Sequence, residues 1–129
     1  MQTRRGSRRP GFTLIEMLVV LAIVALMLSI AAPRYFGSLK HSKDVVLKDS
    51  LTIVRGSIDS FRGDKGRYPN DLQELVTEHY LRAIPLDPIT DSDKSWTLIP
   101  SADPQTSGIV DIKSGAPGAA SDGTPYAQY

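Results

Sequence analysis

The stretch Phe12–Ala32, FTLIEMLVVLAIVALMLSIAA, decides the fold of this chain. Glu16 is its only charged residue, and a helix of this length rises roughly 30 Å, about the thickness of the hydrocarbon core of a bilayer. The stretch therefore predicts a single transmembrane helix, which would anchor the rest of the chain at a membrane surface.

Basic residues before this stretch predict the orientation of the span. Residues 4–9 include four arginines, and positively charged flanks stay in the cytoplasm. We therefore expect a cytoplasmic N-terminus, with everything after Pro33 on the other side of the membrane. A cleaved secretory signal is the alternative. It would require small residues at a cleavage site after the apolar run, and the proline that follows residues 31–32 makes this a poor site.

Glu16 is the exceptional residue of the apolar stretch. A carboxylate at the centre of a membrane helix costs about 2.5–3.5 kcal/mol on insertion scales, so such residues mark a function or a partner. A positively charged partner offsets most of this cost. We therefore expect Glu16 to pair with a cation that the stretch itself does not contain.

The residues around Glu16 carry a resemblance to a known family. Residues 11–16, GFTLIE, and the apolar run after them resemble the class III signal of type IV pilins and type II secretion pseudopilins. The resemblance implies that residues 1–11 are a leader, which a prepilin peptidase removes between Gly11 and Phe12, and that the new Phe12 amine is N-methylated. It further implies that Glu16 pairs with the Phe12 ammonium of a neighbouring subunit during filament assembly.

Pro33 separates the transmembrane and assembly helix, residues 12–33, from the next helical pattern. Proline lacks a backbone N–H and clashes with the carbonyl four residues earlier, here that of Ser29, so we expect local unwinding or a kink. The family resemblance implies that this region melts when subunits pack into a filament. A simple kink at the membrane surface is the alternative.

Residues 34–62 are predicted to form an amphipathic stalk helix. Apolar residues recur there mostly in steps of three and four, with polar residues on the other faces. Gly63 and Gly66 are expected to end the helix. The apolar positions expected to pack on a head are Phe36, Leu39, Leu47, Leu51, Val54, Ile58 and Phe61.

The remaining sequence predicts a small, loop-rich head. A short helix over residues 71–79 is expected, with Asn70 as its N-cap and Gln73 at the reciprocal capping position. Proline-rich connections leave residues 95–99 and 108–113 as strand candidates. The strand side chains expected to bury against the stalk are Trp96, Leu98, Ile109, Val110 and Ile112.

The predicted fold class is therefore α+β. A long N-terminal helix, which is transmembrane anchor and amphipathic stalk in turn, packs on a small head with a short helix and a small antiparallel sheet. The organisation is a cleaved leader (1–11), a transmembrane and assembly helix (12–33) and a periplasmic pilin-like head (34–129) that includes the stalk.

The sequence of the head also indicates whether a metal ion is bound there. The order of Gly-Arg-Tyr-Pro, a short helix, Leu-Asp-Pro and two strands resembles the major, G-type pseudopilins of type II secretion. That family carries a calcium ion in a C-terminal loop, held by aspartates and backbone carbonyls, and the first aspartate follows a Gly-Ala pair. Here Pro117 follows that pair. Asp111 and Asp122 remain as calcium candidates, too few carboxylates for a site that needs about six or seven oxygen donors.

We therefore expect no cofactor. A second acidic cluster lies in the head, but it lacks the glycine and the terminal glutamate of an EF-hand loop. The sequence predicts a solvated turn there, formed by Asp87, Asp91 and Asp93.

Catalysis and nucleic-acid binding find little support. The chain has no cysteine, His41 and His79 are expected to face solvent, and no G-x-S-x-G, H-E-x-x-H or P-loop spacing occurs. Residues 34–67 carry a net charge of +4, and residues 68–129 carry −6. A minor pilin that captures DNA would need the basic stalk exposed in the filament. Neighbouring subunits are expected to cover most of the stalk, so we do not predict a nucleic-acid binder. The missing catalytic motifs likewise lead us to predict no enzyme.

The sequence thus predicts a structural subunit of a type II secretion pseudopilus, which polymerises through its N-terminal helix to drive protein export. The resemblance implies a single-pass protein of the bacterial inner membrane. Its partners would be copies of itself, minor pseudopilins, the inner-membrane assembly platform with its ATPase, and the prepilin peptidase. A major or minor type IV pilin, serving adhesion, motility or DNA uptake, is the alternative.

Overall fold

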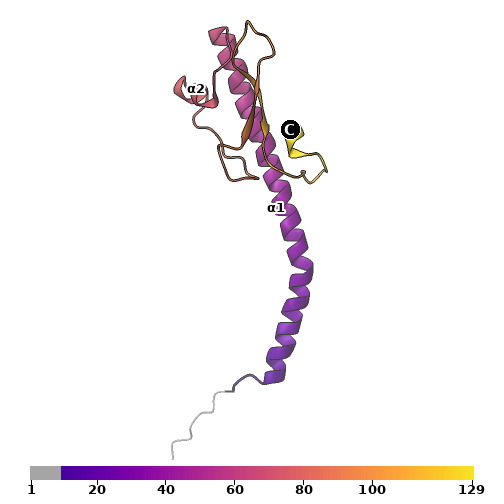
Figure 1. Cartoon of the computed structure of the whole chain (residues 1–129). Coiled ribbons are helices and arrows are strands. Elements are labelled where there is room, and N and C mark those ends of the chain that lie inside the picture. The colour runs from indigo at the N-terminus through magenta and orange to yellow at the C-terminus, as the bar shows by residue number, and fades with distance from the viewer. Residues whose placement is uncertain (1–9) are drawn as a thin grey trace, which may run out of the picture. The chain divides into compact units, whose positions relative to one another are not determined.

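The computed structural model describes residues 10–129, so most of the expected leader (1–11) lies outside the described residues. The chain divides into two compact units, one ending at Phe36 and the other running from Gly37 to Tyr129. Helix α1, Leu14–Lys65, contributes to both units (Figure 1). The elements that follow are α2 (Leu72–Thr77), β1 (Trp96–Pro100), β2 (Ile109–Ser114) and the short 3-10 helix η1 (Tyr126–Gln128), which confirms the α+β fold class.

The first unit consists mainly of the apolar part of α1. Its large side chains from Leu14 to Ile30 are exposed, and the helix contains a window with a mean hydropathy of 2.8, long and apolar enough to cross a membrane. Pro33 lies inside α1, and the local unwinding that we expected there does not occur. Proline removes only one hydrogen bond, the one to the Ser29 carbonyl, and the helix continues on both sides of it.

The C-terminal end of α1 lies beyond the predicted end. We expected Gly63 to stop the helix, but α1 continues through it to Lys65. Gly66 adopts a positive φ of 70° and donates its backbone N–H to the carbonyl of Arg62 over 2.9 Å. A left-handed glycine of this kind ends a helix, whereas a glycine with helical dihedral angles only weakens it.

One face of α1 contributes to the core of the second unit. Leu47, Leu51, Val54, Ile58 and Phe61 follow one another in steps of four and three, and each is at most 1% exposed, as predicted. The prediction was wrong for Phe36 and Leu39, which are 65% and 43% exposed. The buried face begins only at Asp44, so no part of the head covers these two side chains.

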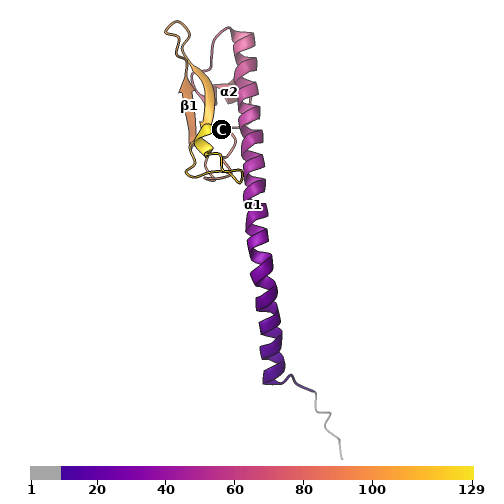
Figure 2. The same ribbon diagram turned by 90° about the vertical axis from the view of Figure 1, so that its right-hand side faces the viewer.

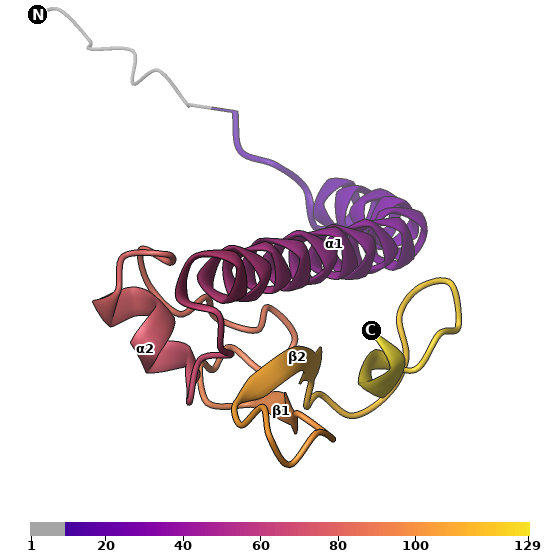
Figure 3. The ribbon, with the colours of Figure 1, turned by 90° about the horizontal axis from the view of Figure 1, so that it is seen from above.

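Strands β1 and β2 form a two-stranded antiparallel sheet, within one residue of the predicted strands. The sheet lies beside α1, with β2 nearer to the helix and β1 outside it (Figures 2 and 3). Trp96, Ile109 and Ile112 are buried, but Leu98, on the outer strand, is 40% exposed, contrary to the prediction.

Val110 is only half-buried, also contrary to the prediction. Pro100 pairs with Ile109 and Ile99 pairs with Asp111, which leaves Val110 without a partner as the extra residue of a β-bulge. A bulge shifts the alternation of side chains by one residue. Simple alternation along β2 would place Val110 on the same face as Ile112. Because of the bulge, Ile109 is buried together with Ile112, and Val110 is not.

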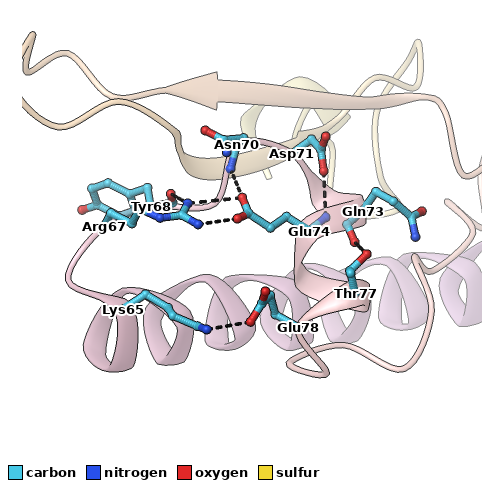
Figure 4. A network of polar contacts seen from close by, with 9 residues as sticks. All are labelled: Lys65, Arg67, Tyr68, Asn70, Asp71, Gln73, Glu74, Thr77 and Glu78. Atoms are coloured by element: carbon cyan, nitrogen blue, oxygen red, sulfur yellow. Dashed lines mark hydrogen bonds and ion pairs between the residues drawn. The ribbon is translucent and has the colours of Figure 1, made fainter.

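The predicted cap of α2 was wrong by one residue. Asp71, with extended backbone dihedral angles (φ −153°, ψ 174°), accepts the backbone N–H of Glu74 over 2.7 Å. Glu74, and not Gln73, reaches back, and its carboxylate accepts the backbone N–H of Asn70 over 2.6 Å (Figure 4). The helix also stops at Thr77, before the predicted end at 79.

The acidic turn around Asp87 was predicted to be solvated, and this is wrong for Asp87. Asp91 and Asp93 are exposed, but Asp87 is completely buried. Its carboxylate accepts the Ser114 hydroxyl over 2.6 Å and the backbone N–H of Ile89 over 2.8 Å. These donors, on β2 and in its own turn, allow a carboxylate to be buried at this position.

The core contacts of α1 predict how single substitutions affect stability. A fragment that begins at Arg34 lacks the apolar span but keeps the core, so we expect it to be soluble and folded. In this fragment, Leu51→Ala should lower the free energy of unfolding by about 2–5 kcal/mol, because it leaves a cavity in the core. Ile53→Ala, two residues away but exposed, should change it by less than about 0.5 kcal/mol. Urea denaturation measures both, and similar losses would contradict the assignment of the buried face.

The lowered pKa of Glu74 predicts that the stability of the head falls at acidic pH. The Arg67 guanidinium, followed by the backbone N–H of Asn70, holds the pKa of Glu74 below its ordinary value of 4.5. A lowered pKa means that the carboxylate contributes its full stabilisation above pH 4.5 and loses it as the pH falls through the folded pKa. Glu74→Gln should therefore be less stable than the unchanged fragment at pH 7, and the difference should shrink towards pH 3.

A matched control is Glu78→Gln. Glu78 pairs with Lys65 over 2.6 Å, but its side chain is 40% exposed, against 19% for Glu74. Exposed ion pairs contribute little to stability, so the control should show a much smaller difference at pH 7. Thermal unfolding followed by circular dichroism between pH 3 and pH 7 measures these effects. If both variants lost the same stability at pH 7, the Glu74 contacts would contribute no more than an exposed ion pair.

Candidate assembly site at the start of helix α1

The first turn of α1 contains a reciprocal pair of side-chain contacts between Thr13 and Glu16. The Thr13 hydroxyl accepts the backbone N–H of Glu16 over 3.2 Å, and the Glu16 carboxylate accepts the backbone N–H of Thr13 over 2.9 Å. This is a capping box, which satisfies two backbone N–H groups that the helix leaves without partners. The sequence signal for it, Thr-x-x-Glu before an apolar run, is present in the chain, but we did not predict the cap from it.

The capping box fixes the position of the Glu16 carboxylate. The carboxylate lies at the N-terminal end of α1, where the helix dipole favours a negative charge. It contacts the backbone of the residue that follows Phe12. Glu16 therefore has a partner within its own chain, although the sequence led us to expect one only from outside. A single backbone N–H does not neutralise a carboxylate in an apolar environment.

The residues around the capping box are apolar and open to the surroundings. Phe12 and Ile15 are exposed. A shallow depression at this position is lined by Phe12, Ile15, Glu16, Val19 and Val20. The surface contains no second titratable side chain. It is suited to packing against another apolar surface that presents a positive charge.

Gly11 is exposed and is not required by the local packing. A Cβ atom added to it would meet no other atom within 4 Å, and its φ lies outside the left-handed region. The glycine before Phe12 therefore has no structural reason within this chain. Pro33, the other predicted assembly residue, lies about 25 Å further along α1 and is not brought close to this site.

The structure does not bring the two calcium candidates together. Asp111 accepts the Arg55 side chain over 2.6 Å, and Arg55 also donates to the carbonyl of Ile112 over 2.9 Å. Asp122 accepts the backbone N–H of Thr124 over 2.9 Å. That hydrogen bond and one from a tyrosine hydroxyl lower the pKa of Asp122 to about 2. Within residues 10–129, no three Asp, Glu, His or Cys side chains cluster as metal ligands would.

Neither histidine lies at the start of α1, but His41 lines a small depression together with Asp122. His41 and His79 are both exposed, as predicted. His79 adopts a positive φ of 64° directly after the end of α2. Its backbone conformation terminates the helix, as an asparagine or glycine often does.

Comparisons with known proteins agree with this arrangement. A family model described as the prokaryotic N-terminal methylation motif matches residues 6–32. Type II secretion system core protein G of Xanthomonas campestris is 30% identical over 78 residues, which cover 59% of this chain and 54% of that protein. The protein of the same name from Klebsiella pneumoniae is 31% identical over 97 residues, 63% of this chain and 69% of that protein. Among solved structures, none matches this chain.

A type IV major pilin protein, PilA of Myxococcus xanthus, is also similar, with 33% identity over 73 residues, 57% of this chain and 33% of that protein. The apolar N-terminal helix, the methylation motif and the α+β head define a pilin-like, membrane-anchored protein. Within that class, the chain belongs to the family of type II secretion system core protein G. The match spans about half of the Xanthomonas protein and about two thirds of the Klebsiella protein.

Proposed function

We propose that this protein is a structural subunit of a type II secretion pseudopilus, which polymerises through the N-terminal part of α1 to drive protein export. The observation that carries the proposal is the apolar, uncovered part of α1, which contains the capped Glu16 in its first turn. Membership of the core protein G family supports it. The protein acts as a structural subunit, and the exposed apolar side chains of its first unit provide the surface on which subunits pack.

The proposed processing and location follow from the N-terminal sequence. A prepilin peptidase cleaves between Gly11 and Phe12 and leaves a methylated Phe12 amine. The arginines of the leader hold the N-terminus in the cytoplasm, so the head from residue 34 lies in the periplasm. The filament assembles from many copies together with minor pseudopilins, an assembly platform in the inner membrane and its ATPase. Pro33, which removes one helical hydrogen bond, is the position where α1 can loosen during assembly.

Glu16 supplies the charge that aligns neighbouring subunits. Its carboxylate is held at the start of α1 by Thr13 and lies among exposed apolar side chains. Removal of the leader creates a new ammonium group at Phe12. When the ammonium of a neighbouring subunit meets Glu16, the desolvation cost of both charges is offset.

A type IV pilin is the second candidate, and the similarity to PilA of Myxococcus xanthus favours it. Both functions use the same N-terminal segment. They differ in what the filament does, because a pseudopilus supports protein export whereas a surface pilus supports adhesion or motility. Loss of export in assembly-deficient variants, with motility unchanged, would distinguish the first function from the second.

The first prediction from this proposal concerns processing. Protein purified from membranes of cells with a prepilin peptidase should begin at a methylated Phe12 in mass spectrometry of the intact chain and its N-terminal peptide. Gly11→Val should block cleavage. Since the space around Gly11 is empty, the loss could not be assigned to misfolding of this chain. Cleavage near Ala32, or a retained Met1, would exclude the proposed processing.

The second prediction separates the charge of Glu16 from its capping role. Glu16→Gln keeps a side-chain oxygen that can accept the Thr13 N–H but loses the charge, whereas Glu16→Ala loses both. Both variants should insert into the membrane and be cleaved. If the charge pairs between subunits, both should assemble few filaments, as seen by crosslinking and electron microscopy, and export should fall in parallel. Normal assembly of Glu16→Gln with failure of Glu16→Ala would assign the role to the cap and contradict the pairing.

A further inference from the structure

The C-terminal segment of the head is tied to α1 through one buried carboxylate. Asp44, on the buried face of α1, is only 5% exposed. It accepts three hydrogen bonds from the other end of the chain: the backbone N–H of Ser121 over 2.8 Å, the Ser121 hydroxyl over 2.6 Å and the Tyr126 hydroxyl over 2.7 Å. A buried carboxylate with three donors is fully satisfied by protein groups.

The electrostatics of this contact are consistent with a strong tie. Burial raises the pKa of Asp44, but the hydrogen bonds from Ser121 and Tyr126 outweigh it, and the pKa lies below its ordinary value of 3.8. Burial, together with the hydrogen bond to Asp44, raises the pKa of Tyr126 to about 12. Asp44 is therefore ionised and Tyr126 protonated at neutral pH, which is the combination that the hydrogen bond requires.

A second tie brings a positive charge to the same segment. Asp122 accepts the Tyr129 hydroxyl over 3.0 Å, and the Lys48 ammonium lies 3.6 Å from the same carboxylate oxygen. The ammonium also lies 4.8 Å from the centre of the Tyr129 ring. Lys48 is one helical turn after Asp44, so both ties come from neighbouring positions on α1.

The loop that these ties hold is the one in which the G-type family resemblance implies calcium, and its oxygen atoms do not fit such a site. Pro117 stands where the first aspartate is expected. The carbonyl oxygens of Gly118, Ala120 and Thr124 each accept a backbone N–H within the loop. Asp122 faces an ammonium group, which would repel a second cation. Calcium requires six to eight oxygen donors, and this loop does not offer them.

We propose that this loop binds no calcium ion and that Asp44 and Lys48 hold residues 118–129 against α1 instead. Asp44 anchors the loop by hydrogen bonds, and Lys48 supplies the positive charge that the loop carboxylate requires. The head is therefore stable without calcium. This inference concerns the folded subunit and does not depend on whether the filament serves secretion or another function.

The first arm of the test uses the full-length chain in detergent micelles. Trp96, the single tryptophan, is buried in the head, so its fluorescence reports unfolding of the head. The melting temperature should be the same, within error, in millimolar calcium chloride and in excess EGTA, and calorimetry should detect no calcium binding. A reproducible rise of several degrees in calcium, or a calorimetric stoichiometry of about one, would overturn the proposal, because a ligand that binds the folded state raises its stability.

The second arm tests the two residues themselves. Asp44→Asn should lower the melting temperature in EGTA by several degrees. Lys48→Gln should lower it by less, because the side chains of its ion pair with Asp122 are about half exposed. In both variants, limited carboxypeptidase digestion should proceed faster from the C-terminus. Asp49→Asn, at an exposed position of the same helix, is the matched control and should behave like the unchanged chain. Tyr126→Phe, which removes one hydroxyl and keeps the ring, should give a smaller effect of the same sign and covers the case that Asp44→Asn does not fold. Melting and digestion of all three variants at the level of the control would contradict the proposal.

Discussion

The head of this protein depends on one face of α1. A sheet of two strands is only marginally stable in water, and here its buried side chains require an apolar surface that the sheet itself does not supply. The apolar residues from Leu47 to Phe61 provide that surface, and the sheet packs beside them. Because one helix supplies both this surface and the apolar first unit, the segment that anchors the chain and the segment that organises the head are the same element of secondary structure.

Polar contacts position three segments of the head. Asp44 holds the C-terminal segment, Arg55 holds β2 through Asp111, and the Arg67 and Glu74 pair holds the turn before α2. The apolar contacts supply most of the favourable free energy, since they are not directional. The contacts of Asp44 and Arg55 determine where the C-terminal segment and β2 lie along α1, because each requires particular donors and acceptors at close range.

Under the proposed function, Glu16 would serve both the free subunit and the assembled one. In the free chain, Glu16 caps its own helix through Thr13, so the carboxylate has a hydrogen-bond donor before any partner arrives. One backbone hydrogen bond does not neutralise the carboxylate, which lies on an apolar surface. The same arrangement orients the carboxylate towards the end of the chain where, under the proposed function, cleavage creates a positive charge.

The sequence by itself determined the features that depend on neighbours along the chain. The apolar run predicted the membrane segment, and the steps of three and four predicted the buried face of α1 from Leu47 to Phe61. The strand candidates found between the prolines agree with β1 and β2 to within one residue. Local patterns misjudged the cap of α2 by one residue and the end of α1 by three. Only the tertiary structure decided which polar groups are buried. Asp44 and Asp87 resemble solvated carboxylates in the sequence, because the donors that satisfy them, on Tyr126 and Ser114, come from segments far away in the chain. Burial of a charge depends on these partners, and no periodicity of the sequence records them.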